Sequence, residues 1–169
     1  MKSVRSLLYK LYEPYKLYKL GMFYTPYHME ETIKYTFSKE ERLCHKAGFE
    51  ALLASGQSFV SYPLRVVYRF YARDEKDAPA RVAISVSKKR FKRAVKRNRV
   101  KRLVREGYRL NKQTLYSAIP EGKTIDILFI YLQDDIFEFH KIEKAITGAI
   151  KKILVYIEKD NGRNIADSD

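Results

Sequence analysis

The segment KTIDILFIYLQ, residues 123–133, most restricts how this chain can fold. It is almost entirely apolar and rich in β-branched and aromatic residues, and Asp126 is its only acid. A run of this kind is typical of a strand that is covered on both faces. We therefore predict a central buried strand, which other elements of the chain must cover.

The segments around this strand predict the remaining elements. Residues 46–56, KAGFEALLASG, are typical of a short helix that ends at Gly56 as its C′ residue. SFVSY and PLRVVYRFYA predict two strands, and ARVAISVS predicts a third after the charged turn RDEKDAP. Residues 94–111 have a helical period, and Asp134 or Asp135 is predicted to cap a last helix. The apolar stripe of that helix consists of Phe139, Ile142, Ile146, Ala149, Ile150, Ile153 and Ile157.

The element order α-β-β-β-α-β-α predicts an α+β fold, a two-layer sandwich of helices packed on one mixed, four-stranded sheet. The domain is expected to begin near FSKEERL, where Ser38 and Glu41 have the spacing of a capping box and predict a helical turn. We assign residues 1–36 to a Tyr- and Lys-rich, poorly ordered N-terminal extension, residues 37–158 to the domain and residues 159–169 to a polar C-terminal tail.

The net charge of +14 is concentrated in residues 81–112. This segment holds fourteen Lys or Arg and one acid, whereas the rest of the chain holds twenty cations and nineteen acids. So local an excess indicates a polyanionic partner. The single cysteine, Cys44, has no partners at zinc spacing, and no apolar run is long enough to cross a bilayer. These features predict a cytoplasmic protein that does not bind membranes.

The helix predicted over residues 94–111 has two different faces. The apolar face, which we expect to dock on the sheet, consists of Val100, Leu103, Val104, Gly107 and Tyr108. The opposite face consists of Asn98, Arg102, Arg105 and Arg109, with Lys101 and Lys112 beside them. Like charges stacked in this way destabilise a helix by roughly 0.2–0.5 kcal/mol per pair. The planar guanidinium fork of arginine suits contact with phosphate. The pattern favours nucleic-acid binding over a merely solvated surface, and Asn98 is either a local cap or a contact to a sugar or base edge.

The segment RVAISVSKKRFKRAVKRNRVKRLVREGYR, residues 81–109, resembles the signature region of the protein subunit of bacterial ribonuclease P. That signature is a strand ending in S-V-S-K-K, then a short loop, then A-V-x-R-N-R-x-K-R-L-x-R-E. Residues 85–89 match its first part and residues 94–106 its second. The resemblance continues more weakly over residues 37–157. It implies a left-handed crossover from the third strand through the basic helix to the fourth, in a fold shared with a ribosomal protein domain.

The resemblance also implies a function. The protein would be the non-catalytic subunit of an RNA-based endoribonuclease that removes the 5′ leader from precursor tRNA. Its partners would be the catalytic RNA and the precursor tRNA, with Mg²⁺ held mainly by the RNA. We therefore predict no catalytic residue, no metal site and no obligate protein partner in this chain.

The resemblance assigns two groups of contact residues. The residues implied to contact the catalytic RNA are Arg97, Asn98, Arg99, Lys101, Arg102 and Arg105, with Lys88, Lys89 and Arg90 as nearby phosphate contacts. The residues implied for a groove that holds the leader are Phe49, Leu53 and Tyr68. Leu53 stands where the family has a second aromatic residue. Packing in the core is the alternative role for Phe49 and Tyr68.

Three other functions stay open from the sequence. A structural RNA-binding protein of the ribosome would share the charge and the core but would need no leader groove. A DNA-binding regulator would normally have a dimerising surface and a helix-turn-helix pair, and neither is found. A stand-alone nuclease would need clustered carboxylates to hold metal ions, whereas Asp126, Asp134 and Asp135 fall in unrelated elements.

Overall fold

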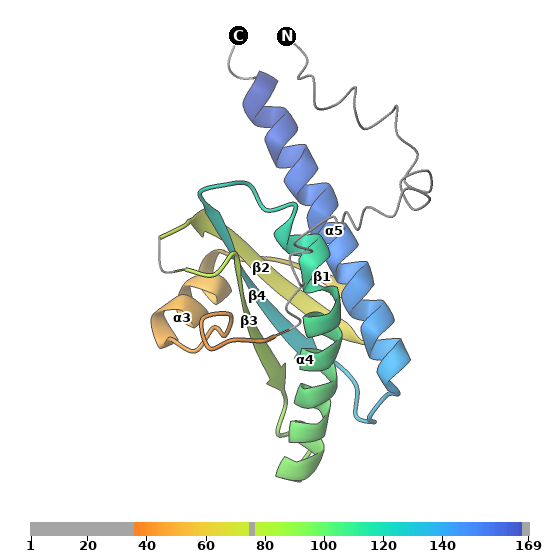
Figure 1. The fold of residues 1–169 in the computed structure, drawn as a ribbon. Helices are drawn as coiled ribbons and strands as arrows, with labels where there is room; N and C mark the ends of the chain where they lie inside the picture. The colour runs from red at the N-terminus through yellow and green to blue at the C-terminus, as the bar shows by residue number, and fades with distance from the viewer. Residues whose placement is uncertain (1–35, 75–76, 167–169) are drawn as a thin grey trace, which may run out of the picture. The chain divides into compact units, whose positions relative to one another are not determined.

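The computed structural model describes residues 36–74 and 77–166 of the chain. Their helices and strands follow the predicted order (Figure 1). The elements are α3 (Lys46–Ser55), β1 (Gln57–Ser61), β2 (Leu64–Ala72), β3 (Ala80–Val86), α4 (Ala94–Tyr116), β4 (Lys123–Tyr131) and α5 (Phe139–Ala166). All but the last residue of the predicted N-terminal extension lies outside the described residues. Helix α5 continues past residue 158, where the sequence analysis places the start of a polar tail.

The strands form one mixed sheet in the order β1-β2-β4-β3. β4 pairs antiparallel with β2 from Leu64↔Tyr131 to Ala72↔Lys123, and parallel with β3 from Ala80↔Ile125 to Val86↔Tyr131. The apolar run is therefore the inner strand that its composition predicts, with most of its side chains buried. Helix α4 forms the crossover between the parallel strands β3 and β4.

The helices cover both faces of the sheet, although unequally. α4 and α5 pack on one face, and α3 lies on the other (Figure 1). Val66 belongs to the larger core under α4 and α5, whereas Val67 packs with Leu52 and Leu128 under α3. Successive residues of a strand point to opposite faces, so both members of this valine pair are buried, each in its own layer. The α+β class and the element order are confirmed, and α3 adds a partial third layer.

Residues 38–43 differ from the sequence-based expectation. The Ser38 N–H donates to Glu41 Oε2 at 3.1 Å, as a capping box requires. The chain makes a single tight turn here rather than a helix, because the next residues run beside β3. The Leu43 N–H donates to the Val82 carbonyl, and the Val82 N–H donates to the Glu41 carbonyl. The open edge of β3 thus satisfies backbone groups that a helix would otherwise have used.

At the end of α3 and at the start of α5, the structure also differs from the predicted helix cap. α3 ends at Gly56 as expected, but Gly56 has an extended backbone with φ −77° rather than the left-handed conformation of a C′ glycine. The predicted cap of α5 is wrong, because this helix begins at Phe139 and the Asp134 carboxylate accepts a hydrogen bond from Arg90 instead. Asp135 contributes only its carbonyl, which accepts from the Tyr131 hydroxyl.

Gly56 is required by close packing between the end of α3 and the sheet. A Cβ atom at this position would lie 2.2 Å from the Leu52 carbonyl oxygen and 2.9 Å from Val67 Cγ1. We expect Gly56→Ala to lower the free energy of unfolding by about 1–3 kcal/mol, the usual cost of overpacking. Urea denaturation measures this. Gly148→Ala in α5, where the nearest atom is Ser61 Oγ at 3.3 Å, is the matched control with a smaller expected effect.

Candidate nucleic-acid interface

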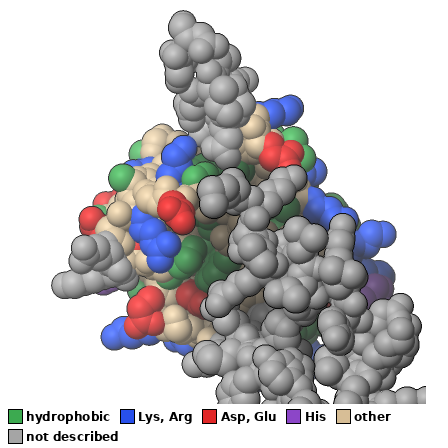
Figure 2. Space-filling model, turned by 45° about the horizontal axis from the view of Figure 1, so that its top comes forward, with side chains coloured by type: hydrophobic (Ala, Val, Ile, Leu, Met, Phe, Trp, Pro, Cys, Tyr) green, Lys and Arg blue, Asp and Glu red, His purple; other side chains and the backbone are tan. Residues whose placement is uncertain are grey.

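The loop before α4 and α4 itself carry a series of exposed cations, here called the basic surface. It consists of Lys88, Lys89, Arg90, Lys92, Arg93, Lys96, Arg99, Arg102 and Arg105, all of which are exposed. The apolar face predicted for this helix is confirmed, with Val100, Val104 and Tyr108 fully buried. Figure 2 shows one side of the molecule, where apolar, cationic and acidic side chains are mixed.

Arg97 is not part of the basic surface and has a structural role. It is half-buried, and its Nη1 atom donates to the carbonyls of Phe91 and Lys92, at 2.7 Å each. Phe91 is itself buried against the ring of Tyr131. Arg97 therefore fastens the cationic loop to the first turns of α4. Asn98 is exposed and lies inside the helix, whose N-cap is Arg93, so the structure does not support the local-cap alternative for Asn98.

The other cations of α4 fall into two groups. Arg102 and Arg105 are exposed, and the Arg105 guanidinium lies 6.0 Å from the centre of the Phe37 ring. Arg109 instead donates to both carboxylate oxygens of Glu106, at 2.9 and 2.6 Å. These hydrogen bonds lower the pKa of Glu106 below its ordinary value. The one acid of the helix is thus neutralised by its own arginine and does not offset the charge of Arg102 and Arg105.

Lys112 is not part of the cationic face, contrary to the prediction. It is 2% exposed, its ammonium forms an ion pair with the carboxylate of Glu41, and it donates to the Thr36 carbonyl at 2.6 Å. The ammonium also lies 5.2 Å from the centre of the Tyr116 ring. Lys112 follows the buried Tyr108 by one helical turn, and this spacing places it on the apolar face. The pair holds residues 36–41 against α4.

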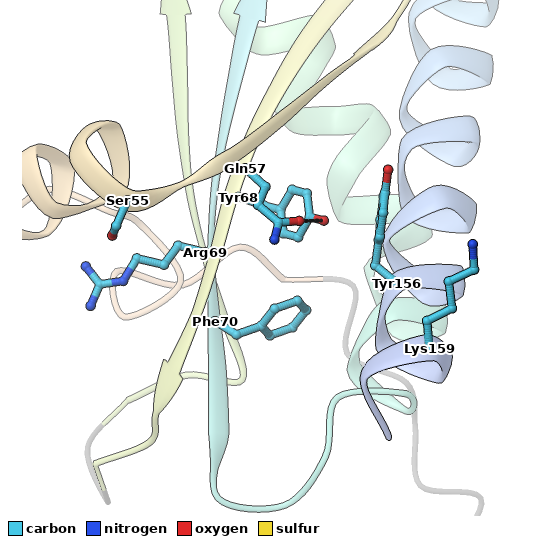
Figure 3. Close-up of a pocket in the computed structure, with 7 residues that line it drawn as sticks. All are labelled: Ser55, Gln57, Tyr68, Arg69, Phe70, Tyr156 and Lys159. Carbon is cyan, nitrogen blue, oxygen red and sulfur yellow. Dashed lines mark hydrogen bonds between the residues drawn. The ribbon is translucent and has the colours of Figure 1, made fainter. Parts of the chain in front are cut away.

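The three residues predicted for a leader groove are not brought together. Phe49 and Leu53 are both on α3, where Phe49 is partly buried and Leu53 is 54% exposed. Tyr68 belongs to the core on the other face of the sheet and points toward α5 (Figure 3). Its hydroxyl donates to Gln57 Oε1 at 2.7 Å, and burial raises the pKa of Tyr68 to about 12. The core-packing alternative is therefore correct for Tyr68.

The side chains of β2 on the α3 face are the alternate set, Arg65, Val67, Arg69 and Tyr71. Sequence reasoning missed Arg65, Arg69 and Tyr71 as candidates, although the period of the strand separates them from Tyr68. The Tyr71 ring is flanked by the guanidiniums of Arg69 and Arg81, 5.7 and 5.1 Å from its centre. This face of the sheet therefore also presents cations beside an aromatic ring.

Asp126, the acid inside the central strand, is held by Arg81. The Arg81 guanidinium donates to the two carboxylate oxygens at 2.8 and 3.1 Å. This hydrogen bonding raises the pKa of Arg81, and a further bond from Arg81 to Asp77 measures 3.2 Å. Asp126 thus serves as a buried counter-ion that links β3 to β4. Among the residues that the structure describes, no three His, Cys, Asp or Glu side chains are grouped to hold a metal ion.

Together, the fold and its charges define an α+β domain whose cationic helix and loop suit a polyanionic chain such as a nucleic acid. No helix in the described ranges is long and apolar enough to cross a membrane. The sequence and the fold are similar to those of known proteins. A sequence model described as ribonuclease P matches residues 37–154.

Two ribonuclease P protein components, from strains of Porphyromonas gingivalis, are similar to this chain. One is 41% identical over 126 residues, which cover 74% of this chain and 91% of the relative, and the other is 44% identical over 117 residues, with 69% and 85% covered. The solved RNase P protein of Thermotoga maritima aligns with a TM-score of 0.53 and 27% identity, over 66% of this chain and 96% of that one. The one from Staphylococcus aureus gives 0.51 and 26%, over 67% and 94%. The chain belongs to the ribonuclease P protein family.

Proposed function

We propose that this member of the family binds the catalytic RNA of ribonuclease P through the basic surface and helps it remove the 5′ leader from precursor tRNA. The observation that carries the proposal is the basic surface itself. Its nine cations are all exposed, and the only acid of α4 is already paired with Arg109. An RNA backbone laid on this surface would release counterions from its phosphates, which favours binding and makes it dependent on salt.

The chemistry is assigned to the RNA and to Mg²⁺ held mainly by it. Several carboxylates of this chain are engaged by its own cations, among them Asp126 by Arg81, Asp134 by Arg90 and Glu41 by Lys112. Their roles are therefore structural, and the chain is proposed to contribute positioning and charge. By offsetting the repulsion between two RNAs, it would lower the Mg²⁺ concentration at which they assemble. The complex of this protein with the catalytic RNA would work in the cytoplasm.

The leader is proposed to lie across the face of the sheet that carries α3. Phe49 and Leu53 supply apolar contact there, with Leu53 widely exposed. Because Tyr68 points to the other face, the sheet would contribute Arg65, Arg69 and Tyr71 instead. Cations can hold phosphates and Tyr71 offers an aromatic ring, a combination that accepts any base sequence.

Reconstitution tests this function. We expect the RNA-free protein to leave precursor tRNA intact, and the protein together with the catalytic RNA to cleave it at a Mg²⁺ concentration at which the RNA alone is inactive. Cleavage by rigorously RNA-free protein, or failure to bind the catalytic RNA at modest ionic strength, would contradict the proposal. RNA recovered with the protein from cells should contain one abundant structured RNA and precursor tRNAs. Recovery of ribosomal RNA instead would favour the ribosomal alternative.

A further inference from the structure

A cavity of about 520 Å³ lies between the edge of β2 and the C-terminal half of α5 (Figure 3). It is lined by aromatic and polar side chains from both elements, among them Tyr68, Phe70, Tyr156 and Lys159. Tyr156 and Lys159 come after residue 154, where the match to the family ends. The cavity is thus completed by a part of α5 that the match to the family does not include.

The wall of the cavity is a cluster of aromatic rings. The ring of Tyr68 lies 5.9 Å from that of Phe70 and 5.6 Å from that of Tyr156, centre to centre. The hydrogen bond to Gln57 fixes Tyr68 in place, whereas Tyr156 is 42% exposed. Figure 3 shows these rings gathered between β2 and α5. The cluster therefore presents the partly exposed ring of Tyr156 on a rigid support.

The rim of the cavity is cationic. Lys159 follows Tyr156 by about one helical turn and also lines the cavity (Figure 3). Arg69 lies at the opposite rim, on the α3 side of β2. Among the described residues that line the cavity, none carries a carboxylate. An exposed aromatic ring between two cations matches a nucleotide, which has a flat base and a negative phosphate.

The cavity and the face proposed for the leader share one residue, Arg69. β1 begins at Gln57, opposite Tyr68, so among the described residues no strand pairs with β2 on this side from Arg69 onward. The edge of the sheet is open at this point, and Arg69 belongs to both surfaces. A single-stranded chain that crosses the α3 face can therefore pass this edge and reach Tyr156.

We propose that the cavity binds one nucleotide of the precursor's leader, farther from the cleavage site than the part that lies on α3. The base stacks on the exposed ring of Tyr156, and the neighbouring phosphates lie beside Lys159 and Arg69. Because stacking on a ring is possible for every base, the contact extends the reach of the protein along the leader without selecting its sequence. This inference rests on the proposed function.

The test uses the particle assembled from protein and catalytic RNA, with precursor tRNAs whose leaders lengthen one nucleotide at a time. With the native protein, we expect affinity to rise at one leader length. Tyr156→Leu should abolish that rise, with a loss of about tenfold for longer leaders and no change for shorter ones. Tyr156→Phe keeps the ring and should retain the rise in affinity. Lys159→Gln should make that rise smaller.

Tyr62→Leu and Lys144→Gln are the matched controls, because Tyr62 is an exposed tyrosine at the far end of β1 and Lys144 is an exposed lysine of α5. Affinity for the catalytic RNA alone is measured for every variant. Any of three results would overturn the assignment. They are an equal loss of affinity at all leader lengths, no loss of affinity in Tyr156→Leu, and weaker binding of the catalytic RNA alone. If the native particle does not assemble at all, the proposed function fails first, and that outcome is distinct from the loss of length dependence.

Discussion

Lys112→Met is expected to lower the free energy of unfolding by about 3–5 kcal/mol, the usual cost of leaving one partner of a buried ion pair without the other. The carboxylate of Glu41 is almost fully buried and forms its ion pair with Lys112. Without that ammonium, the Glu41 carboxylate stays buried without its counter-ion. The Thr36 carbonyl also loses its donor. Denaturation in urea, followed by circular dichroism, measures the change.

The double variant Glu41→Leu with Lys112→Met distinguishes the net contribution of the ion pair to the free energy of unfolding from the cost of removing only one partner. Replacing a buried pair by apolar residues of similar volume is often nearly neutral, so we expect the double variant to recover most of the lost stability. Lys144→Met, at an exposed position of α5, serves as the surface control and should change stability by less than about 0.5 kcal/mol. A loss below about 1 kcal/mol in Lys112→Met would show that the pair does not hold residues 36–41 in place.

The second large effect concerns RNA affinity. Replacing both Arg102 and Arg105 by alanine is expected to weaken binding of the catalytic RNA by about 10- to 100-fold, since each charged contact is worth roughly 1 kcal/mol or more. Both arginines are exposed on the same side of α4, and no acid of that helix is free to offset them. Loss of two phosphate contacts should also flatten the dependence of log affinity on log salt by less than about two units. Filter binding over a range of salt concentrations measures both quantities.

Lys46→Ala with Arg73→Ala is the matched control for charge. These residues are exposed and lie outside the basic surface, and their replacement also removes two positive charges. We expect little change in affinity and none in the salt dependence. Because the Arg105 guanidinium lies over the Phe37 ring, the stability of the arginine variant is measured in parallel. An unchanged salt dependence in the arginine variant would remove both residues from the interface.

Sequence periodicity predicted most of the fold because each element has a distinct pattern. The composition of residues 123–133 indicated an inner strand, and the stripe of α5 is buried from Ile142 to Ile157, as its helical period predicts. The residues of the basic helix were also assigned to the correct faces, with the exception of Lys112. A lysine on an apolar face is normally expected to reach solvent, and its partner Glu41 lies 71 residues away in the sequence.

The leader-contact residues were predicted less well, for a definite physical reason. β2 carries bulky side chains at every position except its last, Ala72, so its alternation separates Tyr68 from Arg69 but does not say which set faces α3. The structure assigns Tyr68 to the core under α5 and leaves Arg65, Arg69 and Tyr71 on the α3 face. Arg97 is a similar case, since its hydrogen bonds to Phe91 and Lys92 depend on the path of the loop.

Local composition and period predicted the element order, the central strand and the concentration of charge in one segment. Packing between elements set which layer each side of β2 meets, buried Lys112 against Glu41, and brought Tyr156 together with Tyr68 and Phe70 around a cavity. These features depend on contacts between residues far apart in the chain. Composition and period within one segment do not indicate which distant residues that segment contacts.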